Sequence, residues 1–147
     1  MALDTASAAI SFAKKLEEDS AKFYKDLSYR YAKDGDIFLS FVKENRKNAV
    51  QIERAYYEVI SDALESCFAF DINPDKYMFK TELPEKASYS DALDWAIEIE
   101  GKIMKFYSDA AEQSKSLMAD VPKNLAMIAK KRSSRILKLR SVLGKEG

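Results

Sequence analysis

Apolar residues recur along this chain at alternating spacings of three and four, in four long stretches. Because an α-helix turns once every 3.6 residues, this spacing gathers the apolar side chains on one face of each helix. Such a face is the seam through which helices pack into a bundle. The predicted helices span about residues 5–32, 37–66, 88–117 and 120–144. Helices of these lengths are roughly 40–45 Å long.

Short breaks and caps separate these helices. Residues 34–35, Asp-Gly, end the first helix, and Asp36 is placed to cap the second. The segment 88–91, Ser-Tyr-Ser-Asp, resembles a capping box at the start of the third. Pro122 falls in the first turn of the fourth helix, where proline is tolerated, and Gly144 is expected to end it.

Residues 68–87 join the second and third helices. This segment is aromatic rather than rich in glycine and serine, and its large apolar residues are Phe68, Phe70, Ile72, Tyr77, Met78, Phe79 and Leu83. It therefore predicts a crossover packed along the bundle, with one helical turn at Asn73-Pro74. The alternative is a linker between two separate hairpins, but an isolated hairpin has no second layer on which to bury its seams.

The pattern thus predicts an all-α fold, an antiparallel four-helix bundle forming a single domain over residues 1–147. Its parts are hairpin one (4–67), the long crossover (68–87) and hairpin two (88–144). A composition of 47% hydrophobic and 33% charged residues, with only 4 Gly and 3 Pro, is typical of a helix-rich globular protein.

Polar residues interrupt the seams near the middle of each helix. They are, in chain order, Glu17, Asn45 with Asn48, Glu100, and Arg132 with Arg135. Buried polar groups are costly unless they meet partners. The heptad phase therefore predicts that these six side chains lie inside the bundle and contact one another. Tyr24 and Tyr107 follow the two glutamates by seven residues on the same stripe.

The first and third helices share a sequence pattern. A shift of 83 residues places Ala13 on Ala96, Glu17 on Glu100, Lys22 on Lys105, and Phe23-Tyr24 on Phe106-Tyr107. This internal repeat predicts two copies of one helical hairpin, related by an approximate two-fold axis.

The run Ala-Leu-Asp-Trp-Ala-Ile-Glu-Ile-Glu at residues 92–100, followed by Phe106-Tyr107, resembles the first helix of the rubrerythrin family, within the ferritin-like superfamily. A weaker copy spans residues 13–24. The resemblance implies a ferritin-like bundle of two hairpins joined by a crossover. Di-iron proteins of this kind take one Glu from each of two helices and a Glu-x-x-His from each of the other two. Glu17 and Glu100 match the single glutamates.

The chain departs from that pattern at the other four ligands. The expected Glu-x-x-His pairs fall on Asn45/Asn48 and Arg132/Arg135, and the chain contains no His. Arginine is never a ligand because it stays protonated. Two carboxylates facing two guanidinium groups still balance in charge. We therefore expect no metal at this vestigial site, and guanidinium groups roughly where iron would lie. The alternative is one iron ion held by Glu17, Glu100 and Asn48.

Two sets of aromatic residues allow more than one interpretation. In rubrerythrin-like proteins, tyrosines at the positions of Tyr24 and Tyr107 donate hydrogen bonds to the metal ligands. Here they either donate to the opposite carboxylate or are plain core aromatics. The flanking stripes are Phe12, Leu16 and Phe23 on one helix, and Trp95, Ile99 and Phe106 on another. These stripes either pack the two helices together beneath the crossover or form part of a homodimer surface.

The loss of redox ligands with charge balance kept favours a non-catalytic scaffold or interaction protein with an unknown protein partner. The resemblance also implies an alternative, a rubrerythrin-like oxidoreductase or iron-binding protein with a reduced site. Nucleic-acid binding is a third possibility, since residues 120–147 carry 8 Lys+Arg against 2 Asp+Glu. No aromatic interleaving or groove-reading motif accompanies those charges, so nucleic acid is not expected as a partner.

Composition also indicates the compartment. The single Cys67 excludes an internal disulfide and a cysteine-based zinc site, and we interpret it as a structural thiol. The first residues lack the basic start and apolar stretch of a signal peptide. No run approaches 18 apolar residues, so no membrane partner is expected. The sequence therefore predicts a cytoplasmic protein.

Overall fold

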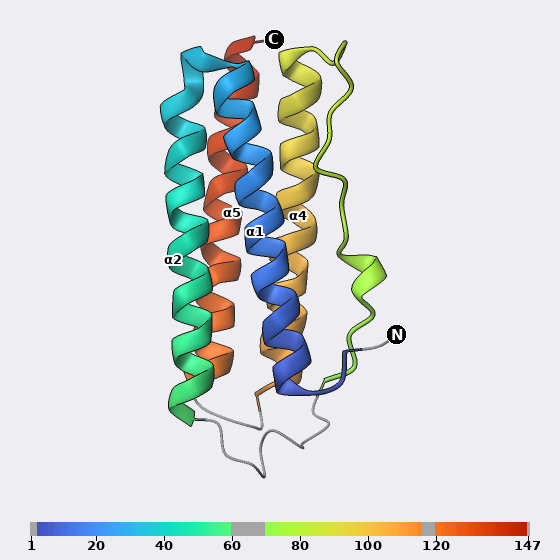
Figure 1. Ribbon diagram of the computed structural model, residues 1–147, viewed down its shortest axis with the longest axis vertical. Coiled ribbons are helices and arrows are strands. Elements are labelled where there is room, and N and C mark those ends of the chain that lie inside the picture. The colour runs from blue at the N-terminus through green and yellow to red at the C-terminus, as the bar shows by residue number, and fades with distance from the viewer. Residues whose placement is uncertain (1–2, 60–69, 116–119, 147) are drawn as a thin grey trace.

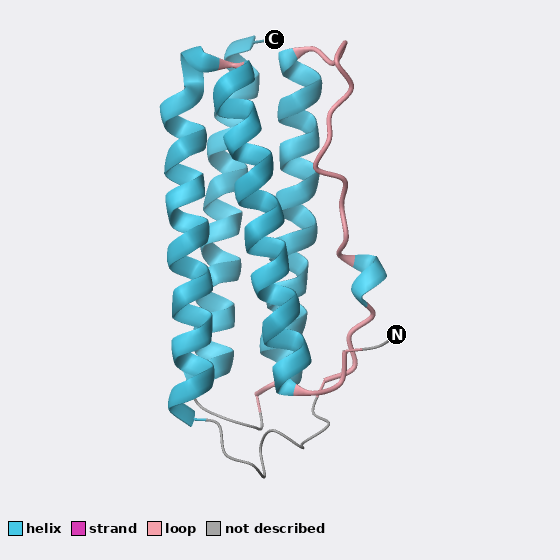
Figure 2. Ribbon diagram, viewed as in Figure 1, coloured by secondary structure: helices cyan, strands magenta, loops and turns pink. Residues whose placement is uncertain are grey.

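Four long α-helices form a bundle in the computed structural model, which describes residues 3–59, 70–115 and 120–146 (Figures 1 and 2). They are α1 (Ala6–Arg30), α2 (Gly35–Val59), α4 (Tyr89–Gln113) and α5 (Asp120–Glu146). Two short 3-10 turns, η1 (Ala32–Asp34) and η2 (Pro74–Lys76), accompany them. The described residues form no strand beyond an isolated bridge between Leu3 and Ile72. The prediction of an all-α bundle is confirmed.

The helices pair as two hairpins. α1 packs most extensively on α2, and α4 on α5, and the chain direction reverses within each pair (Figure 1). α2 ends at one end of the bundle and α4 begins at the other, so the connection between them has to travel the length of the molecule. Buried residues of all four helices and of the crossover belong to one hydrophobic core.

Helix boundaries agree with the sequence in part. Ser88 and Asp91 form the predicted capping box, and α5 begins at Asp120. The expected cap at Asp36 is wrong, because α2 begins at Gly35 directly after η1 and Asp36 lies within its first turn. α5 continues through Gly144 to Glu146, because that glycine keeps a negative φ and does not break the helix.

The crossover packs along the α1–α4 side of the bundle. Phe70, Ile72 and Tyr77 are buried, and η2 forms at the predicted turn, with Asn73 as its N-cap. The Trp95 indole N–H donates to the Lys80 carbonyl oxygen at 2.9 Å. The described part of this segment is therefore packed as predicted, and only a few of its apolar side chains, such as Met78 at 45%, stay exposed. The predicted member Phe68 lies outside the described residues.

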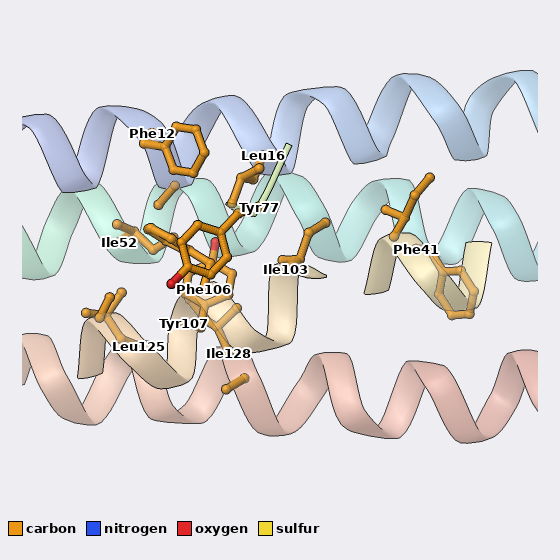
Figure 3. Packing of buried hydrophobic residues seen from close by; sticks show 14 of the residues in the cluster. Phe12, Leu16, Phe41, Ile52, Tyr77, Ile103, Phe106, Tyr107, Leu125 and Ile128 are labelled. Atoms are coloured by element: carbon orange, nitrogen blue, oxygen red, sulfur yellow. The ribbon is translucent and has the colours of Figure 1, made fainter. Parts of the chain in front are cut away.

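The aromatic stripes of α1 and α4 are buried beneath this crossover. Phe12 meets Phe106 edge-on, with ring centroids 5.3 Å apart, and Tyr77 of the crossover meets Phe106 at 5.5 Å (Figure 3). Leu16, Phe23 and Ile99 are also buried, and Trp95 is half-buried. The interpretation in which these stripes pack the two helices together beneath the crossover is confirmed.

Candidate functional site

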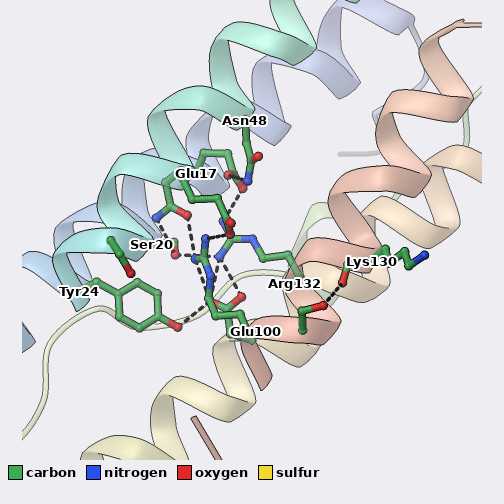
Figure 4. Close-up of polar contacts among 12 residues, drawn as sticks. Glu17, Ser20, Tyr24, Asn48, Glu100, Lys130 and Arg132 are labelled. Carbon is green, nitrogen blue, oxygen red and sulfur yellow. Dashed lines mark hydrogen bonds and ion pairs between the residues drawn. The ribbon is translucent and has the colours of Figure 1, made fainter. Parts of the chain in front are cut away.

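A polar network occupies the centre of the bundle. All six side chains that interrupt the seams are almost wholly inaccessible to water: Glu17, Asn45, Asn48, Glu100, Arg132 and Arg135. They come from all four helices and contact one another (Figure 4). The expectation that they meet inside the bundle is confirmed.

Arg132 of α5 joins the two buried glutamates. Its Nη1 donates to both carboxylate oxygens of Glu100, at 2.9 and 2.8 Å. Its Nη2 donates to Oε2 of Glu17. One guanidinium group therefore lies between carboxylates from α1 and α4, and it forms an ion pair with each.

Arg135 lies one turn further along α5 and connects the network to α2. Its Nη1 donates to Oδ1 of Asn45 at 2.8 Å and, at the longer distance of 3.4 Å, to Oε2 of Glu100. Its Nη2 donates to Oε1 of Glu44 at 2.5 Å. The guanidinium carbon lies 4.6 Å from the ring centroid of Phe41, within cation–π range. Glu44 is 37% exposed, so the network reaches solvent there.

The amides complete the contacts between α1 and α2. Asn48 Nδ2 donates to Oε1 of Glu17 at 2.8 Å, and Asn45 Nδ2 donates to the Ser20 hydroxyl at 3.1 Å. Ser20 also accepts from Arg132 at 3.1 Å. The seam spacing did not indicate Glu44 or Ser20 as members of the site. Ser20 gave a signal, since it is a polar residue on the α1 seam, three positions after Glu17.

Two tyrosines cross between the helices that carry the glutamates. Tyr24 of α1 donates to Glu100 of α4 at 2.6 Å, and Tyr107 of α4 donates to Glu17 of α1 at 3.0 Å. The interpretation in which each tyrosine donates to the opposite carboxylate is confirmed. Each hydroxyl supplies a hydrogen bond to a buried anion, and such charge-assisted bonds are stronger than neutral ones.

The surroundings of Arg132, Tyr24 and Tyr107 keep each of these three groups in one protonation state. Burial disfavours the charged form of Arg132, but the carboxylates of Glu100 and Glu17 outweigh burial and raise its pKa above the usual value. Burial, reinforced by the adjacent carboxylates, raises the pKa of Tyr24 and Tyr107 well above 10.0. At neutral pH the arginine is therefore a cation and both tyrosines are neutral donors.

These raised tyrosine pKa values predict a loss of stability in alkali. Above pH 10 the unfolded chain releases the two protons while the folded protein retains them, so the free energy of unfolding falls as pH rises. Each tyrosine contributes a slope of about 1.4 kcal/mol per pH unit between the unfolded and folded pKa values. Urea unfolding between pH 8 and 11 measures this. In the Tyr24→Phe/Tyr107→Phe variant the decline should be shallower; an unchanged slope would contradict the assignment.

The donor set does not fit a di-iron centre. All four carboxylate oxygens of Glu17 and Glu100 already accept hydrogen bonds from this chain. Among the buried side-chain oxygens of the described residues, only Asn48 Oδ1 lacks a partner. No group of three or more His, Cys, Asp or Glu residues in the described part of the chain is arranged to hold a metal ion. A divalent ion would have to displace a guanidinium group from its carboxylates.

Other observations bear on the site less directly. A surface hollow of about 500 Å³ lies beside the crossover against Trp95 and Ile99, but no member of the network lines it. Cys67, predicted to be a structural thiol, lies outside the described residues.

Comparison with known proteins finds no relative of this chain. No protein-family model, curated protein or solved structure matches this chain. None of the helices within residues 3–59, 70–115 and 120–146 has both the length and the hydropathy to cross a membrane.

Proposed function

We propose that this chain is a ferritin-like, rubrerythrin-related bundle in which a buried Glu, Arg and Asn network replaces the di-iron centre, and that it is a non-catalytic scaffold or interaction protein. One observation carries the proposal. The guanidinium group of Arg132 lies between Glu17 and Glu100, and every oxygen of those carboxylates is engaged by the chain itself.

The reciprocal tyrosine bonds support the repeat that underlies this proposal. Tyr24 reaches from α1 to α4 and Tyr107 reaches from α4 to α1, so each helix supplies one carboxylate and one hydroxyl. This exchange is expected of two hairpin copies related by a two-fold axis.

The protonation states of the network argue against acid–base catalysis. A general acid or base works best with a pKa near the operating pH. Here Tyr24, Tyr107 and Arg132 all have raised pKa values and hold their protons at neutral pH. The fixed ion pairs therefore suit a structural role.

Iron binding tests the proposal. Protein purified aerobically from iron-supplemented cultures should contain no stoichiometric iron by mass spectrometry, and anaerobic titration with Fe(II) should show no binding that depends on the glutamates. The Glu17→Gln/Glu100→Gln variant is the matched control, and its residual iron should equal that of the native chain. A content of about two ions per chain, lost in this variant, would reject the proposal.

A second candidate is a protein that binds one iron ion at a reduced site. It is favoured by the unpartnered, buried Oδ1 of Asn48, whose Nδ2 already bonds to Glu17. The same titration distinguishes it, because binding of one ion per chain should be abolished by Asn48→Leu as well as by the double glutamine variant.

A further inference from the structure

The side of the bundle formed by α2 and α5 carries a concentration of positive charge. The described part of the crossover lies beside α4, on the side of the molecule away from α2 (Figure 1). We call the following set the basic face: Lys43, Lys47 and Arg54 of α2, with Lys131 and Lys138 of α5. Four of these side chains are exposed and Lys131 is half-buried.

Contacts between the helices place these residues side by side. Gln51 Nε2 donates to Oδ1 of Asn124 at 2.8 Å, and Arg135 forms its ion pair with Glu44. Both contacts join α2 to α5. Lys47 stands one turn from Glu44 and one turn from Gln51, while Lys131 stands between Asn124 and Arg135. Lys47 and Lys131 therefore flank the same stretch of the contact between α2 and α5.

Helical spacing extends each position into a row. Lys47 and Arg54 are seven residues apart on α2, and Lys131 and Lys138 are seven apart on α5. Two turns of helix return a side chain to the same face, about 10 Å further along the axis. The two helices thus present adjacent rows of cations.

Within the described ranges, these cations have no acidic ion-pair partners of their own. Among the residues that the structure describes, no member of the basic face makes an ion pair, whereas Lys14, Lys15 and Lys105 on other faces do. Glu44, the carboxylate between the rows, is used by Arg135. Rows of like charge repel one another, and an acidic ligand relieves that repulsion.

Apolar contact area accompanies the charge. A hollow of about 500 Å³ on α2 is lined by Arg46, Lys47, Val50, Gln51 and Arg54. Within it Val50 is 53% exposed, and on α5 Met127 is 42% exposed, one turn before Lys131. A ligand on this face therefore meets lysines together with isolated apolar side chains.

We propose that the basic face binds an acidic amphipathic helix of a partner protein. This inference rests on the proposed function, since it names the partner of a non-catalytic interaction protein. Carboxylates spaced three and four residues apart on the partner helix pair with the two rows of cations, and its apolar positions contact Val50 and Met127. Helix-in-groove recognition of this kind relies on such anchors.

The chemistry of the face disfavours other occupants. A symmetric dimer through this face would bring identical patches together, placing lysine rows against lysine rows. Single-stranded nucleic acid binds through aromatic platforms as well as charge. Tyr29 on α1 is the aromatic side chain that stands out as exposed among the described residues, and it does not belong to the α2–α5 face.

The test uses a fluorescein-labelled synthetic amphipathic helix with Glu on one face and Leu on the other, at about 0.15 M salt. A second labelled peptide carries Lys in place of every Glu. Fluorescence anisotropy should show saturable binding of the acidic helix and no binding of the Lys version. Lys47→Glu/Lys131→Glu should weaken it by roughly tenfold or more. The matched control, Lys22→Glu/Lys25→Glu, makes the same change in net charge at exposed positions of α1 and should leave affinity within about twofold.

Three outcomes would overturn the inference: no binding of the acidic helix, equal weakening by both variants, or tighter binding of a 20-nucleotide DNA strand that is lost in Lys47→Glu/Lys131→Glu. The last result would assign the face to nucleic acid. Iron titration of the same samples distinguishes a failure of this inference from a failure of the proposed function, because loss of peptide binding does not alter metal content.

Discussion

Replacing Arg132 with leucine is expected to destabilise the bundle by about 3–5 kcal/mol, because it leaves the buried Glu17 carboxylate without a cation and Glu100 with only its longer contact to Arg135. Glu17 and Glu100 both form ion pairs with this guanidinium group, and all three side chains are at most 1% exposed. Urea unfolding followed by far-ultraviolet circular dichroism at pH 7 measures the change.

A control and a compensating variant isolate the cause. Lys130 lies two residues away on α5, points away from the network (Figure 4) and is exposed, so Lys130→Leu should shift stability by no more than about 0.5 kcal/mol. Combining Arg132→Leu with Glu17→Gln and Glu100→Gln should recover much of the loss, since it removes the stranded charges. Equal effects of the Arg132 and Lys130 changes would contradict the buried ion pairs.

Restoring the four absent ligands is expected to convert this chain into a metal-binding protein. Asn45→Glu, Asn48→His, Arg132→Glu and Arg135→His would place a Glu-x-x-His pair on α2 and another on α5, facing Glu17 and Glu100. If the bundle has the proposed ferritin-like arrangement, the quadruple variant should bind about two Co(II) ions per chain. Visible absorption and metal analysis after gel filtration measure this gain.

The same variant carrying Glu17→Gln and Glu100→Gln is the control, and it should lose stoichiometric cobalt. Crowding of carboxylates makes the metal-free quadruple variant less stable, so added Co(II) should raise its helicity and thermal midpoint. A helical quadruple variant that takes up no cobalt would show that the facing positions do not share one site, and the proposed relationship to di-iron bundles would fail.

The spacing of residues was sufficient to predict which side chains are inside. The period of an α-helix assigns each position to a face, so Asn45, Asn48, Arg132 and Arg135, standing where apolar residues are expected, had to enter the core. The packed crossover followed from its aromatic content, because so many large apolar side chains require burial.

Pairing within the site was decided by tertiary structure. Helical period says which face a residue occupies, but not the relative heights of two helices or the rotamers of long side chains. In the folded chain, Arg135 therefore pairs with Glu44 at the edge of the buried face of α2. The Ser20 hydroxyl accepts hydrogen bonds from both Asn45 and Arg132. Helix ends also depended on tertiary packing. α2 begins at Gly35, where an added Cβ would lie 3.3 Å from the Ser28 carbonyl oxygen. This close approach between α1 and α2 cannot be inferred from the local sequence.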